Sequence, residues 1–210
     1  MMKLLSDFNE QPITKQLILS ALKNYKRPYD KINELVKQGD LTPVKRGIYI
    51  AGSKAGIKRP EPFLLANHLT GPSYISMESA LSYWGLIPEK VFEITSATTQ
   101  KSIVYKTKVG RYRYIKVPLP YYAFGLRRVE LTPRQHIMIA TAEKALCDKI
   151  ITTSRLFLRS TKQAKDFLID DLRIDRDDLR KLDIAQMEIW LKHIPKRNSI
   201  AMLIKTLKNL

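Results

Sequence analysis

Apolar residues recur at helical spacing in two neighbouring segments near the N-terminus. The first pattern predicts an amphipathic helix over residues 13–25, which a basic Lys-Arg-Pro stretch ends. A second apolar stripe predicts a helix from Tyr29 to Gly39, a glycine in the position that commonly terminates helices. Two short extended segments follow, at residues 41–44 and 47–50, with cations between them. The order helix, turn, helix, hairpin is typical of a winged helix-turn-helix.

The pattern changes twice in the rest of the chain. Residues 51–60 carry glycines, lysines and a proline without apolar periodicity, which indicates a linker. Two short helices are predicted beyond it, at 63–69 and 76–84. β-Branched and aromatic runs then predict a small sheet, with strands at residues 91–95, 103–105, 111–117 and 127–131. From Thr141 onward, capping residues and apolar spacing predict helices alone.

These patterns predict an α+β fold in two domains. Residues 1–59 form the winged helix-turn-helix DNA-binding domain, and residues 60–210 form a larger domain with a small β-sheet and a helical C-terminal part.

Composition excludes several classes of protein. With 44% hydrophobic and 27% charged residues, the chain can build a core and is not intrinsically disordered. No stretch approaches the ~20 apolar residues of a membrane span, and the first residues lack the features of a signal peptide. Cys147 is the single cysteine, which fits a reducing compartment. We therefore expect a cytoplasmic protein without a membrane partner.

The net charge of +17 favours an anionic partner, although a soluble basic protein with no nucleic-acid role has the same charge. The positive excess per residue is highest in residues 1–60, and this places the expected electrostatic contact there.

The sequence contains no motif with the residue spacing of a known catalytic or metal-binding site. The three histidines lie more than fifty residues apart, and none has a second ligand at metal-binding spacing. The Gly-Ser-Lys sequence from Gly52 lacks the glycine spacing of a phosphate-binding loop. The acidic residues between Asp166 and Asp178 alternate with cations and are read as solvated or helix-capping. The sequence predicts no enzyme activity, no cofactor and no metal site.

The winged segment supplies the candidate DNA-binding residues. In such modules the second helix enters the major groove, while flanking cations and the wing contact phosphates. Asp30 and Glu34 of that helix could accept from cytosine, or could serve only the helix terminus and an ion pair with a neighbouring lysine. The predicted DNA contacts are Lys23, Lys26, Arg27, Tyr29, Lys31, Asn33, Lys37, Lys45 and Arg46.

The chain resembles the AbiEi antitoxins of type IV toxin–antitoxin systems, associated with abortive phage infection. The N-terminal similarity lies in residues 35–41 and 44–49. The more specific similarity lies in Tyr74-Ile75-Ser76, Ser79-Ala80-Leu81 and Trp84-Gly85-Leu86-Ile87, and then in the block Ala142-Glu143-Lys144-Ala145-Leu146-Cys147-Asp148.

The resemblance implies an autorepressor of a two-gene operon that binds inverted repeats in double-stranded DNA. It also implies that the protein counters a nucleotidyltransferase-like toxin without forming a stable complex with it.

A second surface is predicted in the larger domain, for nucleic acid or for antitoxicity. The alternative is a structural role: the strand residues pack in the sheet with their cations in solvent, and Glu143 lies in the first turn of a helix. The surface comprises Arg111, Arg113, Lys116, Arg127, Arg128, Glu143 and Lys144. Two other functions remain open: an RNA-binding or RNA-modifying protein that uses its sheet face, and an interaction module that neutralises a toxin by direct contact.

Overall fold

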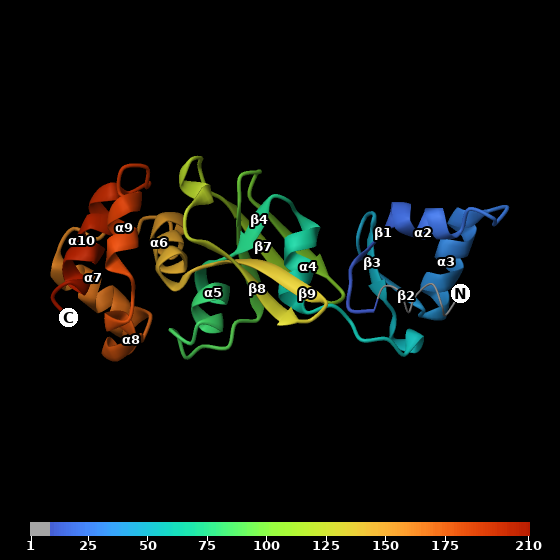
Figure 1. The fold of residues 1–210 in the computed structure, drawn as a ribbon, viewed down its shortest axis with the longest axis horizontal. Coiled ribbons are helices and arrows are strands. Elements are labelled where there is room, and N and C mark those ends of the chain that lie inside the picture. Colours follow the sequence, from blue (N-terminus) through green and yellow to red (C-terminus); the bar gives the residue numbers. More distant parts are fainter. Residues whose placement is uncertain (1–8) are drawn as a thin grey trace.

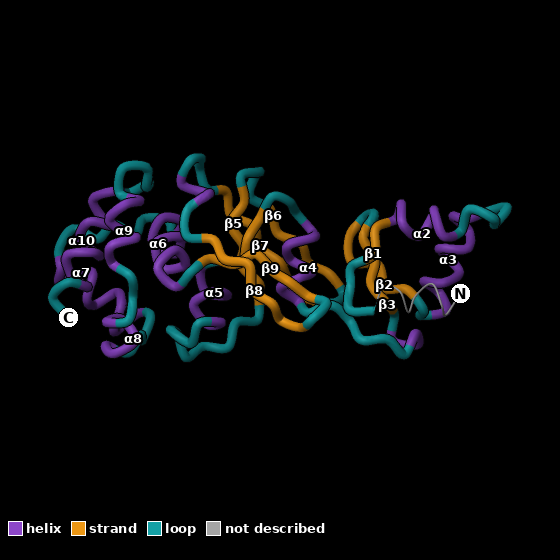
Figure 2. The backbone as a smooth tube through the Cα atoms, in the orientation of Figure 1, coloured by secondary structure: helices purple, strands orange, loops and turns teal. Residues whose placement is uncertain are grey.

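The computed structural model describes residues 9–210 and shows an α+β protein. The molecule is elongated (Figure 1). A small sheet with two helices forms one end, a larger sheet lies in the middle, and the C-terminal helices form the other end (Figure 2).

The helices and strands have the following bounds. The strands are β1 (Ile13–Thr14), β2 (Leu41–Lys45), β3 (Ile48–Ala51), β4 (Ser73–Ile75), β5 (Glu93–Thr98), β6 (Ile103–Thr107), β7 (Gly110–Lys116), β8 (Leu126–Thr132) and β9 (Gln135–Ala140). The α-helices are α2 (Lys15–Ala21), α3 (Pro28–Gln38), α4 (Pro62–Leu69), α5 (Met77–Tyr83), α6 (Ala142–Thr152), α7 (Thr161–Asp166), α8 (Arg176–Arg180), α9 (Ile184–Trp190) and α10 (Arg197–Leu207). Short 3₁₀ turns lie at η1 (Ser53–Ala55) and η2 (Tyr121–Ala123), and a π-helical turn, η3 (Phe167–Asp171), continues α7.

The N-terminal unit, residues 9–59, is built on a three-stranded antiparallel sheet in the order β1-β3-β2. Its own hydrophobic cluster joins α2 and α3 to the sheet, and consists of Ile13, Ile18, Leu22, Ile32, Leu35 and Leu41. Because α3 contributes only Ile32 and Leu35 to the buried set, most of that helix faces away from the cluster.

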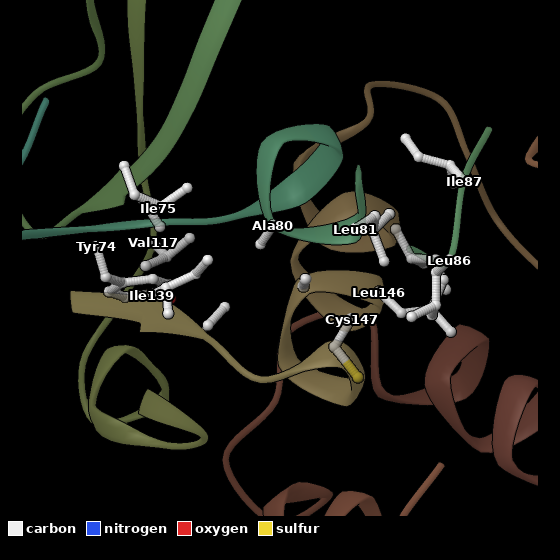
Figure 3. Close-up of a cluster of buried hydrophobic side chains, with 14 of the residues drawn as sticks. Tyr74, Ile75, Ala80, Leu81, Leu86, Ile87, Val117, Ile139, Leu146 and Cys147 are labelled. Carbon is white, nitrogen blue, oxygen red and sulfur yellow. The ribbon is translucent and has the colours of Figure 1, made fainter. Parts of the chain in front are cut away.

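The central sheet has the order β6-β7-β5-β4-β9-β8, and two of its pairs, β4 with β9 and β5 with β7, are parallel. Helices α5 and α6 pack against each other beside it. Figure 3 shows apolar side chains of the sheet, such as Ile75 and Ile139, continuing into those of α5 and α6, with Cys147 among them. Burial raises the pKa of the Cys147 thiol, so this cysteine behaves as a small apolar core residue.

The N-terminal unit is packed directly against the central sheet. Val44 and Ile50 of its hairpin belong to the large hydrophobic cluster, not to the small one. Glu10 accepts hydrogen bonds from Thr132 Oγ1 (2.9 Å) and Gln135 Nε2 (3.3 Å), next to the turn between β8 and β9. The interface between the two parts therefore combines apolar and polar contacts.

A buried charge network joins β4, η2 and α6. Lys144 Nζ lies 2.9 Å from Asp148 Oδ1, and the side chains of both residues are fully buried. Tyr121 donates to the same carboxylate oxygen over 2.7 Å, while Ser76 and Tyr74 donate to Oδ2 over 2.6 and 3.0 Å. The Lys144 ammonium also donates to the Tyr121 carbonyl and lies 3.1 Å from the centroid of its ring. The burial of both charges is thus accompanied by hydrogen bonds to each of them.

The sequence misplaced or missed several elements. Strands β4 and β9 were not predicted, and the strand expected at 91–95 is instead β5 at Glu93–Thr98. Ile13, expected at the start of a helix, pairs with Tyr49 in the small sheet. Helix α2 begins two residues later, at Lys15, because Thr14 accepts a hydrogen bond from Leu17 N and caps it.

The Lys144–Asp148 pair gives a stability prediction. Lys144→Met leaves the Asp148 carboxylate buried without its counter-charge, which is expected to lower the free energy of unfolding by about 3–5 kcal/mol. Urea denaturation followed by circular dichroism measures this loss.

Lys149→Met is the matched control, because Lys149 lies on the same helix and pairs with Glu78 at the partly exposed surface. The control is expected to lose no more than about 1 kcal/mol. Equal losses for the two variants would contradict the assignment of Lys144 as the counter-charge of a buried carboxylate.

Candidate nucleic-acid interface

Local signals set the ends of α3. Pro28 occupies its first turn, where a missing N–H costs nothing, and Gly39 ends it with a φ of 82°, a left-handed conformation that favours glycine. The exposed face of the helix carries Tyr29, Asp30, Asn33, Glu34, Lys37 and Gln38. Figure 1 shows α3 at the end of the molecule farthest from the C-terminal helices, so neither the central sheet nor those helices cover it.

The cations around α3 differ in their availability. Lys23, Lys26, Lys37 and Arg46 are exposed and form no ion pair within residues 9–210. Arg27 is also exposed, and its guanidinium reaches Asp30 at 3.9 Å, a contact too long to hold it. These five side chains can contact phosphates without first breaking a close ion pair.

Lys31 is less free than its neighbours. Its ammonium lies 2.7 Å from Glu34, which also accepts from Gln38. The hydrogen bond with Glu34 raises the pKa of Lys31, and that with Lys31 lowers the pKa of Glu34. Base contact by Lys31 would thus require this surface pair to open. Asn33, two residues away, has its side chain exposed without such a partner among the described residues.

Lys45 does not lie where the sequence placed it. Its ammonium donates to the Leu69 carbonyl over 2.7 Å and lies 4.6 Å from the centroid of the Tyr105 ring. The side chain therefore points toward the central sheet and anchors the hairpin, whereas Arg46, the next residue, is exposed. The prediction of Lys45 as a phosphate contact at the tip of the hairpin is therefore wrong, because its ammonium contacts the Leu69 carbonyl and the Tyr105 ring instead.

A shallow groove brings Lys15 together with two of the predicted residues. Lys15 and Gln16 of α2, Tyr29 of α3 and Arg46 of the hairpin line it. The Lys15 ammonium lies 4.5 Å from the centroid of the Tyr29 ring, and the backbone N–H of Lys15 donates to the Gly47 carbonyl. Sequence analysis missed Lys15, because its position on the polar side of a helix says nothing about its distance from Tyr29 or Arg46.

The second predicted surface is not assembled as one patch. Lys116 lies on β7 and Arg127 and Arg128 lie on β8, the edge strand four inter-strand steps away. All three side chains are exposed. The strand order, which the sequence does not reveal, separates these cations across the width of the sheet.

Arg111 and Arg113 of that predicted surface are both paired with Glu93. Arg113 Nε lies 2.5 Å from Glu93 Oε2, and Arg111 contacts the other carboxylate oxygen. Burial alone would raise the pKa of Glu93, but the hydrogen bonds and charges of Arg113 and Arg111 outweigh it and hold this pKa below its usual value. The parallel register sets Glu93 opposite Arg111, so one acid holds both arginines.

The prediction for Lys144 is wrong. It was predicted on a surface, yet its side chain is fully buried in the network with Asp148. Burial lowers the pKa of Lys144, although the Asp148 charge and hydrogen bond oppose this effect. Glu143, its neighbour, accepts from the backbone N–H of Asp183 over 2.9 Å and so joins α6 to the start of α9. Both residues have structural contacts instead of a shared functional surface.

Other chemistry can be surveyed only in the part of the chain that the structure describes. There, no group of three or more His, Cys, Asp or Glu side chains could hold a metal ion. None of the helices between residues 9 and 210 is both long and apolar enough to cross a membrane.

Glu93 gives a prediction for acid stability. A carboxyl whose pKa is lowered by folding contributes stability above its unfolded pKa, and this contribution is lost as the pH falls through the folded pKa. Glu93→Gln removes that titration. The unfolding free energy of the variant is therefore expected to fall less than that of the wild type between about pH 6 and pH 3, as measured by urea denaturation. Parallel falls in the two proteins would contradict the ion-pair assignment.

Comparison with known proteins shows the fold and no more. No family model matches the sequence, and no curated protein matches it. Among solved structures, the crystal structure of the RV2827C protein from Mycobacterium tuberculosis is similar, with a TM-score of 0.62 over 93% of this chain and 72% of that chain. At 15% sequence identity, this similarity indicates a shared architecture.

Proposed function

We propose that the protein is a double-stranded-DNA-binding regulator whose N-terminal unit is a winged helix-turn-helix. In this proposal α3 is the recognition helix, and the turn of the β2–β3 hairpin is the wing. The element order β1-α2-α3-β2-β3 supports it, since this is the order of the winged modules that place one helix in the major groove.

The observation that carries the proposal is the face of α3 that is exposed among residues 9–210, with cations beside it that form no close ion pair there. Tyr29, Asn33 and Lys37 lie on that face in solvent. An amide side chain such as Asn33 suits an adenine edge, while Lys26, Arg27 and Arg46 suit phosphates. The acids Asp30 and Glu34 balance the lysines of α3 itself, so the attraction to phosphates comes from the cations that flank the helix.

DNA binding can be tested by mobility shift on the region upstream of the protein's own gene. The double variant Arg27→Ala/Arg46→Ala removes two phosphate contacts, so binding should weaken on all duplex sequences. The slope of log affinity against log salt should fall by about 1.8, since each contact contributes about 0.9. Lys101→Ala/Lys106→Ala removes the same charge from exposed positions outside the N-terminal unit and should leave the slope unchanged. A loss of equal size in both variants would sink the assignment.

Base recognition can be tested separately with Asn33→Ala. This variant should bind its operator about 5–150-fold more weakly, equivalent to 1–3 kcal/mol, and keep its affinity for unrelated duplexes. Retention of operator affinity would show that α3 does not read bases through Asn33.

The antitoxin role is a second part of the proposal and rests on the AbiEi resemblance. Its two larger sequence blocks meet in the buried network, where Tyr74 and Ser76 contact Asp148. Co-expression with a nucleotidyltransferase-like toxin from the adjacent gene is expected to restore growth, and co-purification is expected to recover no toxin. Growth arrest in the presence of folded antitoxin would contradict this part, and a stable complex would favour neutralisation by direct contact.

A further inference from the structure

The C-terminal helices carry a concentration of cations that the proposed DNA site does not use. Residues 153–165 contain four Lys or Arg, and residues 192–210 contain five, with no Asp or Glu in either segment. The two segments pack side by side: the backbone N–H of Leu158 donates to Ser199 Oγ over 3.0 Å, and Thr206 Oγ1 donates to the Thr161 carbonyl over 3.3 Å. This concentration of charge lies at the end of the molecule opposite α3 (Figure 1).

Two of these nine cations are already engaged. Lys196 Nζ donates to the carbonyls of Ile150, Thr153 and Leu156 around the end of α6, and Lys208 pairs with Glu188 at 2.6 Å. The remaining seven form no ion pair within residues 9–210: Arg155, Arg159, Lys162, Lys165, Lys192, Arg197 and Lys205. Such a surface attracts anions, because neither segment contributes an acid to it and Glu188 neutralises only Lys208.

A groove of about 450 Å³ lies between these segments. Residues 157–159 form one wall, and Asn198, Ala201 and Met202 of α10 lie on the other. Lys205 follows Ala201 and Met202 at helical spacing, so it lies on the same stripe of α10. Cations thus stand on both sides of a partly apolar groove.

Phe157 is the aromatic residue of the groove, and it is 55% exposed. Lys196 lies 5.1 Å from its ring centroid, which fixes the ring at the rim while leaving more than half of the residue in solvent. An exposed aromatic ring beside free cations is the arrangement by which proteins hold unpaired bases, the ring stacking on a base and the cations contacting the adjacent phosphates. Duplex DNA offers no unpaired base for such stacking.

We propose that this groove binds single-stranded nucleic acid, with a base stacked on Phe157 and the flanking phosphates on Arg159 and Lys205. The groove is a second site, independent of the N-terminal unit. RNA and single-stranded DNA both offer bases for stacking and phosphates for charge contacts. The experiment below distinguishes the two ligands.

The test uses the full chain and fluorescence anisotropy of labelled oligouridine and oligothymidine of equal length. Phe157→Ala is expected to bind both strands about 5–150-fold more weakly, the equivalent of 1–3 kcal/mol for one stacked base, whereas Phe157→Trp keeps the ring and should retain binding. Arg159→Ala/Lys205→Ala should lower the salt slope by about 1.4. Stronger binding of oligouridine would identify RNA as the ligand, and equal binding would identify any single strand.

Two controls keep this site distinct from the DNA site. Arg27→Ala/Arg46→Ala should weaken duplex binding and leave oligouridine binding unchanged, while Phe157→Ala should do the reverse. Lys106→Ala/Lys108→Ala removes two exposed cations elsewhere and should change neither. The proposal is overturned if the wild type does not bind single strands, if Phe157→Ala binds them as well as the wild type, or if the Lys106/Lys108 control loses as much affinity.

Discussion

The arrangement of the molecule depends on the buried ion pair between Lys144 and Asp148. Neither charge is tolerated in a dry interior unless its partner and its hydrogen bonds are in place, so the pair fixes α6 against β4 and η2. The C-terminal helices continue from α6, and β4 lies at the centre of the sheet that carries the N-terminal unit. This polar contact and the large hydrophobic cluster therefore join the parts of the chain to which we assign two different binding surfaces.

Much of the helical structure could be predicted because its signals are local. Thr141, Ser160, Asp175 and Asp183 belong to the residue types that cap helices, and each accepts a hydrogen bond from the first turn of the helix that follows it. The sheet was harder to predict. Strand β4 has three residues and pairs with β5, more than twenty residues later, and with β9, more than sixty residues later, so its stability comes from partners that no local pattern contains.

In the candidate site, too, some features follow from local sequence and others depend on tertiary contacts. The exposure of Lys26 and Arg46 follows from the amphipathic pattern and the hairpin, both of which are local. The positions of Lys45 and Arg111 depend on what lies opposite them, the Leu69 carbonyl in one case and Glu93 in the other. Charge can therefore be counted from a sequence, but the fraction of it that remains free for a ligand is set by tertiary contacts.

The β2–β3 hairpin has a role in both hydrophobic clusters. Leu41 is buried with α2 and α3, whereas Val44 and Ile50 are buried with the central sheet. Because the two strands contribute buried residues to both clusters, unfolding of either cluster removes packing contacts from the other. The chain should consequently unfold cooperatively across this boundary, and a cut at the linker would expose apolar surface on both pieces instead of releasing two self-sufficient modules.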